Sequence, residues 1–328
     1  MKYYLGIDIG ATKTAALICD EEGHFIGEGQ GGPGNHETVG FEGMEKSIQE
    51  ALQQALAQAG IQINQISGAG FGIAGYDWHS EESQMKATVN KTGLTAPYKM
   101  VNDVVLGLLA GTSEGWGVAV VSGTGCNCRG WDREHKREGR VTGYGITMGE
   151  GAGGSELVHR AMQVLGYSWV KRLPPTALSD AFIEMVGAKS LEDLIQGYTE
   201  QYYEIGADAA PIIFQVARQG DPVANDLVRW AGKELGEMAN AVIRQLELQD
   251  SEFEIALIGS MFKSGEILIN PMRETVFSIA PKAKLIPVEV KPVLGAVLLG
   301  MEACNTTITP EIRRILTQKS QVYGGVSL

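Results

Sequence analysis

The sequence predicts an α/β fold of two domains that enclose a cleft. At 328 residues the chain is long for one hydrophobic core, because domains hold roughly 150 residues each. A unit of strand, glycine turn and strand occurs near the start of the chain and again from residue 116 onward. Mixed helical and strand patterns follow each unit. We therefore predict one domain over residues 1–115 and a second domain, with a helical insertion, over residues 116–328.

The first domain is expected to open with a β-meander. An apolar run over residues 3–9 ends at Gly10, an alternating run covers 13–19, and a third run covers 24–29. The elements expected after the meander are a helix over 41–56 that ends at Gly60, a buried strand over 68–74, a polar amphipathic segment over 80–91, a strand near 98–101 and a helix that begins at Asn102 and Asp103.

The second domain is expected to repeat the meander before it becomes mainly helical. Strands over 118–122 and 126–131 flank a second glycine turn, and a third strand runs toward Val141. Because the order and the turn placement match the first meander, we predict an internal duplication, with two unrelated hairpins as the alternative. The later elements are expected as helices over 155–166, 177–186, 191–195, 205–219 and 222–246, a strand over 253–258, an amphipathic segment over 272–279, and helices over 292–303 and 310–317.

The charge balance argues against a large nucleic-acid surface. The formal net charge is −12 at pH 7, whereas phosphate backbones are held mainly by clustered lysine and arginine. The one basic stretch, residues 133–140, is interrupted by Glu134 and Glu138, so we interpret it as a solvated hairpin. We expect no nucleic-acid partner. An anionic ligand would be bound locally by backbone N–H groups, a metal ion and a few cations.

The cysteine count and the hydropathy indicate a cytoplasmic protein. The four cysteines, Cys19, Cys126, Cys128 and Cys304, are too few and too scattered for a disulfide framework, which favours a reducing compartment. No run reaches the ~18 apolar residues that a bilayer span requires. We therefore expect no signal segment and no membrane partner.

The first glycine turn has the composition of a phosphate site. Gly10 allows the backbone to approach a phosphate closely. Thr12 and Thr14 offer hydroxyl donors, and Lys13 offers a positive charge. Asp8, at the end of the preceding strand, is expected near a magnesium ion. A purely structural hairpin contains the same residue types, so this turn alone leaves both interpretations open.

Two further glycine sites strengthen the phosphate interpretation. Gly123, Thr124 and Gly125 form a turn at the equivalent place in the second meander. If the meanders face each other across a cleft, both turns can contact one triphosphate. Gly259 and Ser260 end a strand and open a helical segment, where a base or ribose can lie against the backbone without a Cβ in the way.

Asn102 and Asp103 follow a strand and head a helix. Both residue types favour the N-cap of a helix, which is the structural interpretation. A carboxylate at the mouth of a cleft can also accept the proton of a hydroxyl that attacks a phosphate. Both interpretations can hold for one Asn-Asp pair.

The ordered set of these motifs resembles the BadF/BadG/BcrA/BcrD-type ATPase family, and within it the branch of N-acetylglucosamine kinases and archaeal hexokinases. The resemblance runs from Tyr4 to about Ala303. The motifs that carry it are Asp8–Thr14, Gly34-Asn35, Gly72–Asp77, Asn102-Asp103, Gly123–Gly125, Gly143-Tyr144-Gly145, Gly149–Gly154, Gly259–Phe262 and Gly295–Gly300. It implies two actin-like, ribonuclease H-like domains with a cleft between them, a homodimer, and phosphorylation of a sugar by ATP with Mg²⁺.

The resemblance also implies a role for each matching position. Asp103 matches the catalytic base. The positions that match nucleotide contacts are Asp8, Gly10, Thr12, Lys13, Thr14, Gly123, Thr124, Gly125, Gly259 and Ser260, with Ala207 matching a small residue of the adenine pocket. The positions that match sugar contacts are Asn35, Asp103, Thr124, Gly125, Gly143 and Tyr144. The family's usual G-D-E-G-S-G is G-E-G-A-G-G over residues 149–154 here, so the acidic sugar contact is expected at Glu150, and the identity of the sugar stays open.

Two other functions are compatible with this superfamily. One is the ATPase that activates 2-hydroxyacyl-CoA dehydratases and holds an iron–sulfur cluster on cysteines, for which Cys126 and Cys128 are the candidates. These two cysteines lie at i and i+2 within one strand, on the same face, and the activators' cysteine-led glycine segment is not visible. The other function is a sugar-sensing regulator, which would need an additional DNA-binding helix-turn-helix.

Overall fold

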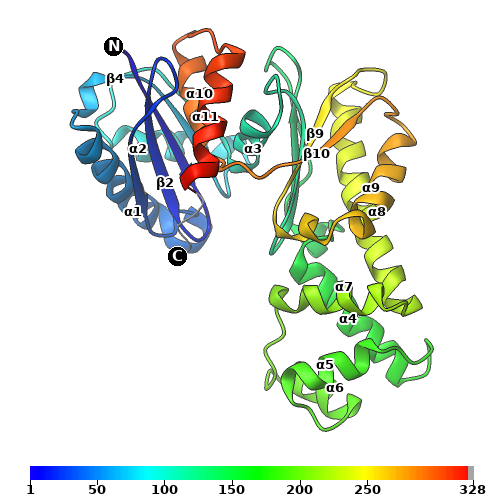
Figure 1. Ribbon diagram of the computed structural model, residues 1–328. Helices are drawn as coiled ribbons and strands as arrows, with labels where there is room; N and C mark the ends of the chain where they lie inside the picture. The colour runs from blue at the N-terminus through cyan, green and yellow to red at the C-terminus, as the bar shows by residue number, and fades with distance from the viewer. Residues whose placement is uncertain (324–328) are drawn as a thin grey trace.

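The first of two five-stranded sheets is formed by the start of the chain. The computed structural model describes residues 1–323 (Figure 1). The first sheet has the order β3-β2-β1-β4-β5. Its strands are β1 (Tyr3–Ile9), β2 (Thr14–Asp20), β3 (Phe25–Gly31), β4 (Ile66–Ile73) and β5 (Tyr98–Asn102). The β1, β2 and β3 strands form an antiparallel meander, and β4 runs parallel to both β1 and β5.

The second sheet repeats this topology, which confirms the predicted internal duplication. Its order is β10-β9-β6-β7-β8. Its strands are β6 (Gly117–Ser122), β7 (Cys126–Trp131), β8 (Glu138–Arg140), β9 (Glu254–Ile258) and β10 (Lys284–Pro287). β6, β7 and β8 form an antiparallel meander, and β9 runs parallel to both β6 and β10. The edge strand β10 was not predicted, because four partly exposed residues that end in a proline carry little strand pattern.

Helices cover both faces of the first sheet. They are α1 (His36–Ala59), α2 (Glu82–Asn90), α3 (Asp103–Gly111), α10 (Val293–Ala303) and α11 (Pro310–Tyr323). α1 ends at Gly60 as predicted, with φ of 65°, but it begins five residues before the predicted Phe41. The early start follows from Asn35, whose side chain accepts a hydrogen bond from the Glu37 N–H at 2.9 Å and caps the helix.

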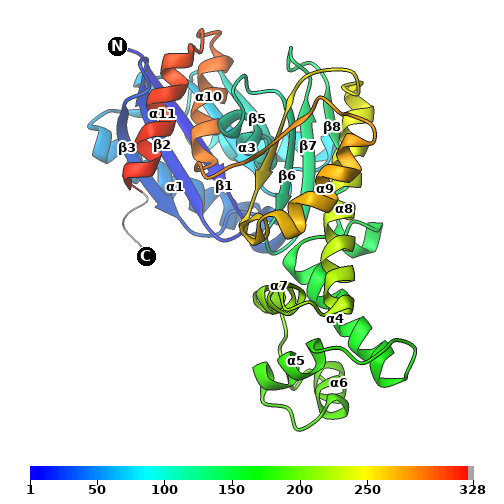
Figure 2. The same cartoon turned by 45° about the vertical axis from the view of Figure 1, so that its right-hand side comes forward.

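The chain returns to the first sheet near its end. Although α10 comes after the whole second sheet in sequence, it packs against β1, β4 and α3. Its Val297 and Leu298 join the core around Tyr4, while Ala296 and Leu299 face the core around Leu106. The division into domains over residues 1–115 and 116–328 stays a proposal. Although α10 and α11 fall in the second of these ranges, they lie beside the first sheet (Figure 2).

The helices of the second lobe pack against its sheet at one end of the group and extend away from it at the other (Figure 1). They are α4 (Gly154–Trp169), α5 (Leu178–Val186), α6 (Leu191–Thr199), α7 (Ala210–Arg218), α8 (Pro222–Leu246) and α9 (Glu266–Phe277). The helix predicted from residue 205 begins as a short 3₁₀ turn over Ala207–Ala209, and α7 follows it with Pro211 in its first turn. Over residues 1–323, none of the helices has the length and apolarity that crossing a bilayer needs.

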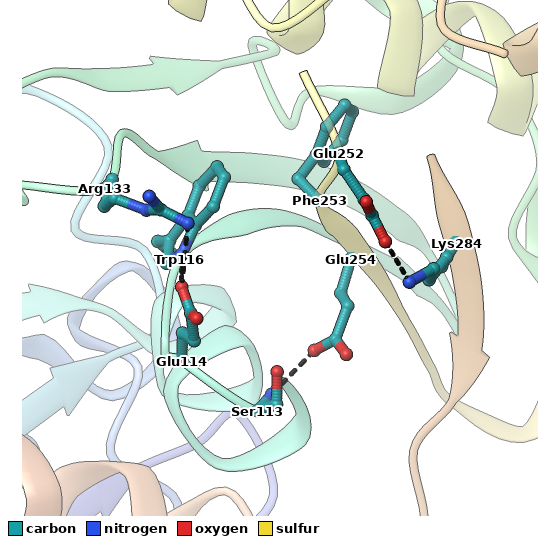
Figure 3. Close-up of a pocket in the computed structure, with 8 residues that line it drawn as sticks. All are labelled: Ser113, Glu114, Trp116, Arg133, Glu252, Phe253, Glu254 and Lys284. Atoms are coloured by element: carbon teal, nitrogen blue, oxygen red, sulfur yellow. Dashed lines mark hydrogen bonds and ion pairs between the residues drawn. The ribbon is translucent and has the colours of Figure 1, made fainter. Parts of the chain in front are cut away.

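An apolar seam joins the two lobes. Val104 and Leu108 of α3 lie in one buried cluster with Ala119 of β6 and Trp131 of β7. The linker that follows α3 is fixed to the second sheet, because the Ser113 N–H donates to a Glu254 carboxylate oxygen at 2.6 Å (Figure 3). The seam therefore places the first residue of α3 at the boundary between the lobes.

The cavity drawn in Figure 3 lies beside this linker and has a volume of 260 Å³. Its charged groups are matched with one another: Arg133 pairs with Glu114 at 3.2 Å and stacks on Trp116, and Lys284 pairs with Glu252. These paired side chains help to hold the linker in place. None of the predicted ligand-binding residues lines this cavity.

Candidate active site

The first glycine turn joins β1 to β2. The Gly10 N–H donates to the Lys13 carbonyl at 3.0 Å, and the Gly10 carbonyl accepts from the Gly34 N–H at 3.0 Å. Thr12 and Lys13 are exposed, whereas Thr14 is buried, and within the described part of the chain its hydroxyl has no hydrogen-bond partner. A buried hydroxyl without a partner is costly, so this turn is suited to accept a polar ligand.

Asp8 stands at the end of β1, next to this turn. Loss of water around its carboxyl group and, to a smaller extent, the negative charge of Asp103 raise the pKa of Asp8 to about 7, although Lys13 opposes both effects. A cation beside the Asp8 carboxylate would relieve this unfavourable charge, and an oxygen donor suits Mg²⁺. The residue types and the electrostatics at Asp8 therefore fit a magnesium ion.

The second glycine turn joins β6 to β7 and is fixed by the segment over residues 149–154. Three hydrogen bonds attach this region to the turn: Ser122 Oγ to the Ala152 carbonyl at 2.6 Å, the Gly154 N–H to the Gly123 carbonyl at 2.8 Å, and the Ser155 N–H to the Thr124 carbonyl at 2.8 Å. A Cβ at position 153 would lie 2.4 Å from the Gly125 carbonyl carbon. Position 153 is serine in the family motif and glycine here, and the glycine allows the segment to pack closely under the turn.

A cavity of 580 Å³ opens beside the second turn and brings together residues predicted from distant parts of the sequence. Gly123, Thr124, Ala207 and Ser260 line it together with Ala210, Pro211, Phe214 and Met261. Gly259 has φ of 112°, and a Cβ there would meet the Ser122 carbonyl oxygen at 2.3 Å. The size of the cavity and its largely apolar walls are typical of a site for a planar aromatic base.

This cavity gives a direct test of the nucleotide assignment. Replacing Ala207 with Leu should fill part of the cavity and raise the KM for ATP on the order of 10-fold, a change equivalent to about 1.4 kcal/mol. The KM for the second substrate should be unchanged. Steady-state kinetics with ATP varied would measure the effect. Ala57→Leu, on the exposed face of α1, is the matched control, and an unchanged KM for ATP in Ala207→Leu would contradict the assignment.

The structure separates the two roles considered for Asn102 and Asp103. Asn102 is the N-cap of α3, since its side-chain oxygen accepts from the Val104 N–H at 3.1 Å. Asp103 is the first residue of the helix, and its side chain is not needed for the cap. Burial and the charge of Asp77 raise the pKa of Asp103 to about 6, although Arg129 and hydrogen bonds from the Val104 and Asp103 N–H groups oppose them. A carboxylate with this pKa can act as a base near neutral pH.

Arg129 of β7 is a buried cation that links the two lobes. It is 3% exposed and donates to Asp77 of the first lobe and to Glu138 of β8, each at 2.5 Å. Asp77 in turn accepts from the Asn102 side-chain amide at 3.2 Å. Arg129 of the second lobe is therefore connected through Asp77 to Asn102, the residue that precedes Asp103 in the first lobe. Sequence reasoning missed it, although an arginine inside an otherwise apolar strand was a usable signal.

Of the remaining predicted residues, Gly143, Tyr144 and Glu150 lie in or beside a glycine-rich turn over 143–145, and Asn35 lies at the start of α1. The Glu150 carboxylate accepts from the Thr142 and Gly143 N–H groups, both at 2.7 Å, so in this structure it holds the turn in place. The Tyr144 hydroxyl accepts from Trp78 Nε1 at 2.9 Å, a contact between the two lobes. Asn35 caps α1 through its oxygen. Direct contacts of Asn35, Gly143, Tyr144 and Glu150 with a sugar stay a proposal.

Cys126 and Cys128 do not have the properties of cluster ligands. Both are buried in the core of the second lobe on the same face of β7. Burial raises the pKa of Cys126 to about 11 and that of Cys128 well above its usual value. Because the thiolate is the form that binds metals, these two side chains belong to the core.

Two duplicated sheets, a glycine turn at the end of the first strand of each, and a nucleotide-sized cavity beside one turn define an actin-like ATPase. The chain belongs to the BadF/BadG/BcrA/BcrD ATPase family, whose sequence model matches residues 5–300. The predicted family and the predicted pair of actin-like domains are thus confirmed.

Individual proteins are similar along most of the chain. The N-acetylmuramic acid/N-acetylglucosamine kinase of Clostridium acetobutylicum is 27% identical over 93% of this chain and all of its own length. The N-acetyl-D-glucosamine kinase of Dictyostelium discoideum is 25% identical over 92% of this chain and 98% of its own. Among solved structures, a protein proposed to be an N-acetylglucosamine kinase from Chromobacterium violaceum has a TM-score of 0.65 at 24% identity, covering 91% of this chain and 99% of that one.

Proposed function

We propose that this protein is an ATP-dependent sugar kinase whose substrate is an amino sugar such as N-acetylglucosamine or a related hexose. The observation that carries the proposal is the position of Asp103: it follows the Asn102 cap and lies at the seam between two lobes that each carry a glycine turn. Its pKa of about 6 leaves it mostly ionised at neutral pH. The sugar kinases similar to this chain support the same activity.

Both lobes contribute residues to the proposed reaction. ATP would lie with its base in the cavity beside Gly123 and Ala207 and its phosphates between the two glycine turns. A magnesium ion near Asp8 would supply charge neutralisation at the phosphates. Asp103 accepts the proton of the sugar hydroxyl as the hydroxyl oxygen bonds to the terminal phosphorus of ATP, the bond from that phosphorus to the β-phosphate oxygen breaks, and ADP leaves. Closure of the lobes through Trp78 and Tyr144 would exclude water and limit wasteful hydrolysis.

We also expect a homodimer in the cytoplasm. The four cysteines are too few and too scattered in the sequence for a disulfide framework, which supports a reducing compartment. Light scattering of the purified protein would measure its oligomeric state.

The proposed function is tested by ATP consumption with a panel of sugars. Glucose, glucosamine, N-acetylglucosamine and N-acetylmuramic acid should be compared at equal concentration, with phosphorylated product identified by mass spectrometry. We expect at least one amino sugar to stimulate ADP release with matching sugar phosphate. ATP hydrolysis that no sugar stimulates would reject the proposal.

A further inference from the structure

A second cavity beside the second glycine turn has a volume of 550 Å³. Gly125 of this turn lines it together with the glycine-rich turn over 143–145. The nucleotide cavity is lined instead by Gly123 and Thr124, and the two cavities share none of their lining residues. Two segments that match sugar contacts therefore meet at a cavity that is separate from the nucleotide site.

The walls of this cavity combine apolar side chains with a small polar region. The apolar side chains come from three parts of the second lobe: Ile146 follows the glycine-rich turn, Tyr198 lies on α6, and Ile205 precedes α7. Three polar side chains near the start of α4 also line it, namely Ser155, Glu156 and His159. The cavity therefore suits a group that has an apolar body and a hydrogen-bond donor.

Glu156 has a carboxylate oxygen that lacks a donor. It is the third residue of α4, where a glutamate commonly binds the N–H of the N-cap residue. Its Oε2 is buried here and has no hydrogen-bond partner among the residues that the structure describes. Burial raises the pKa of Glu156, although the nearby N–H groups of Glu156 and Gly153 oppose the rise. Because an unsatisfied buried carboxylate is costly, this position favours a ligand that supplies a donor.

The other oxygen of this carboxylate lies beside the two segments that match sugar contacts. A Cβ on Gly145 would lie 3.1 Å from Glu156 Oε1, and a Cβ on Gly125 would lie 3.8 Å from the same atom. Because both positions are glycine, neither has a side chain that could cover the carboxylate. A ligand that lies over the two turns can therefore reach Glu156.

Glu150, where the sequence places the acidic sugar contact, already has donors. Its two carboxylate oxygens accept from the Thr142 and Gly143 N–H groups, each at 2.7 Å. Glu150 is also absent from the residues that line the cavity. Of the two glutamates beside these turns, Glu156 is therefore the one with an oxygen available to a substrate.

We propose that Glu156, in place of Glu150, is the carboxylate that determines specificity for the sugar: it accepts the amide N–H of an N-acyl amino sugar, and the acyl group lies in this cavity. This inference rests on the proposed kinase function and assigns the residue that recognises the substituent of its substrate. The amide N–H supplies the missing donor, and the acyl carbons cover the side chains of Ile146 and Ile205. The volume of the cavity accommodates acyl groups longer than acetyl.

The first test compares three sugars in the unmodified protein. They are N-acetylglucosamine, its N-butanoyl analogue, and 2-O-acetylglucose, an ester of the same outline that has no N–H. We expect kcat/KM for the N-acetyl amide to exceed that for the ester on the order of 10- to 100-fold, because the ester leaves the buried carboxylate without a donor. The N-butanoyl amide should be used at least as well as the N-acetyl amide, since its added carbons are buried. Equal values for the amide and the ester, or a tenfold fall for the N-butanoyl amide, would overturn the inference.

Glu156→Gln tests which residue is the acceptor. The variant keeps the shape of the side chain but loses the charge-assisted bond, so kcat/KM for N-acetylglucosamine should fall on the order of 10-fold and that for the ester should not fall. Glu184→Gln, exposed on α5, is the matched control and should leave both values unchanged. No loss for the amide, or an equal loss for both sugars, would remove Glu156 from this role. If the unmodified protein phosphorylates no sugar, the kinase function itself fails; if it phosphorylates N-acetylglucosamine without these differences, only the assignment of Glu156 fails.

Discussion

Asp103→Asn is expected to lower kcat for sugar phosphorylation by roughly 100- to 10,000-fold, the usual contribution of a general base. The amide has nearly the shape of the carboxylate but cannot take the hydroxyl proton. Because the Asn102 side chain caps α3, the helix should keep its start and the protein its thermal midpoint. Single-turnover measurement of sugar phosphate, with sugar saturating, measures the chemical step directly.

The affinity for ATP distinguishes loss of the base from loss of the site. The residues placed around the nucleotide are on the two glycine turns and in the cavity beside the second turn, and Asp103 is not among them, so the Kd for ATP should stay within about twofold. Asp226→Asn, on the exposed face of α8, is the matched control and should retain full turnover. Undiminished phosphorylation by Asp103→Asn would remove this residue from the role of base.

The same carboxylate sets the acid side of the pH profile. With a pKa of about 6, Asp103 takes up a proton as the pH falls through 6, and kcat/KM for the sugar should fall with it. With magnesium saturating, the bound cation would keep Asp8 ionised despite its pKa of about 7, so the profile should be flat between about pH 7 and 8 and drop tenfold per unit well below 6. An acid limb with a midpoint near 4 would show that the functional carboxylate is an exposed one.

The sequence predicted the elements that have long or regular patterns. β1, β7 and α8 have the bounds expected from strand alternation and helical spacing, and two matching meanders were enough to predict the duplicated sheets. The return of α10 to the first sheet was not predicted. Its small and apolar residues are compatible with any tightly packed partner, and the choice of partner depends on the complete fold.

Some residues of the candidate site could likewise be predicted from the sequence, and others could not. Turns such as Gly123–Gly125 carry their chemistry in a short stretch of sequence and could be proposed from it. Arg129 and Asp77 are 52 positions apart, and the stacking of Arg140 on Trp78 joins the two lobes. Such pairs arise from the relative position of the lobes, and a single sequence contains no local pattern for them.

Arg129→Met should destabilise the protein more than any exposed charge substitution. Removing one partner of a buried ion pair costs about 3–5 kcal/mol, because the remaining carboxylates keep their loss of hydration without compensation. For a chain of this size the thermal midpoint should fall by roughly 5 to 10 °C. Differential scanning calorimetry measures it. Arg137→Met, exposed and paired with Asp132 and Glu247, should cost no more than about 1 kcal/mol.

The pH dependence of this loss identifies its cause. Burial already raises the pKa of Asp77 while Arg129 lowers it, so in the variant the pKa of Asp77 rises further. A carboxyl group whose folded pKa lies above its unfolded value binds a proton more readily in the folded state, and stability then falls as the pH rises between those two values. Arg129→Met should therefore be closest to the unmodified protein near pH 5 and furthest from it near pH 8. A deficit that is the same at both pH values would point to lost packing of the arginine side chain instead of uncompensated charge.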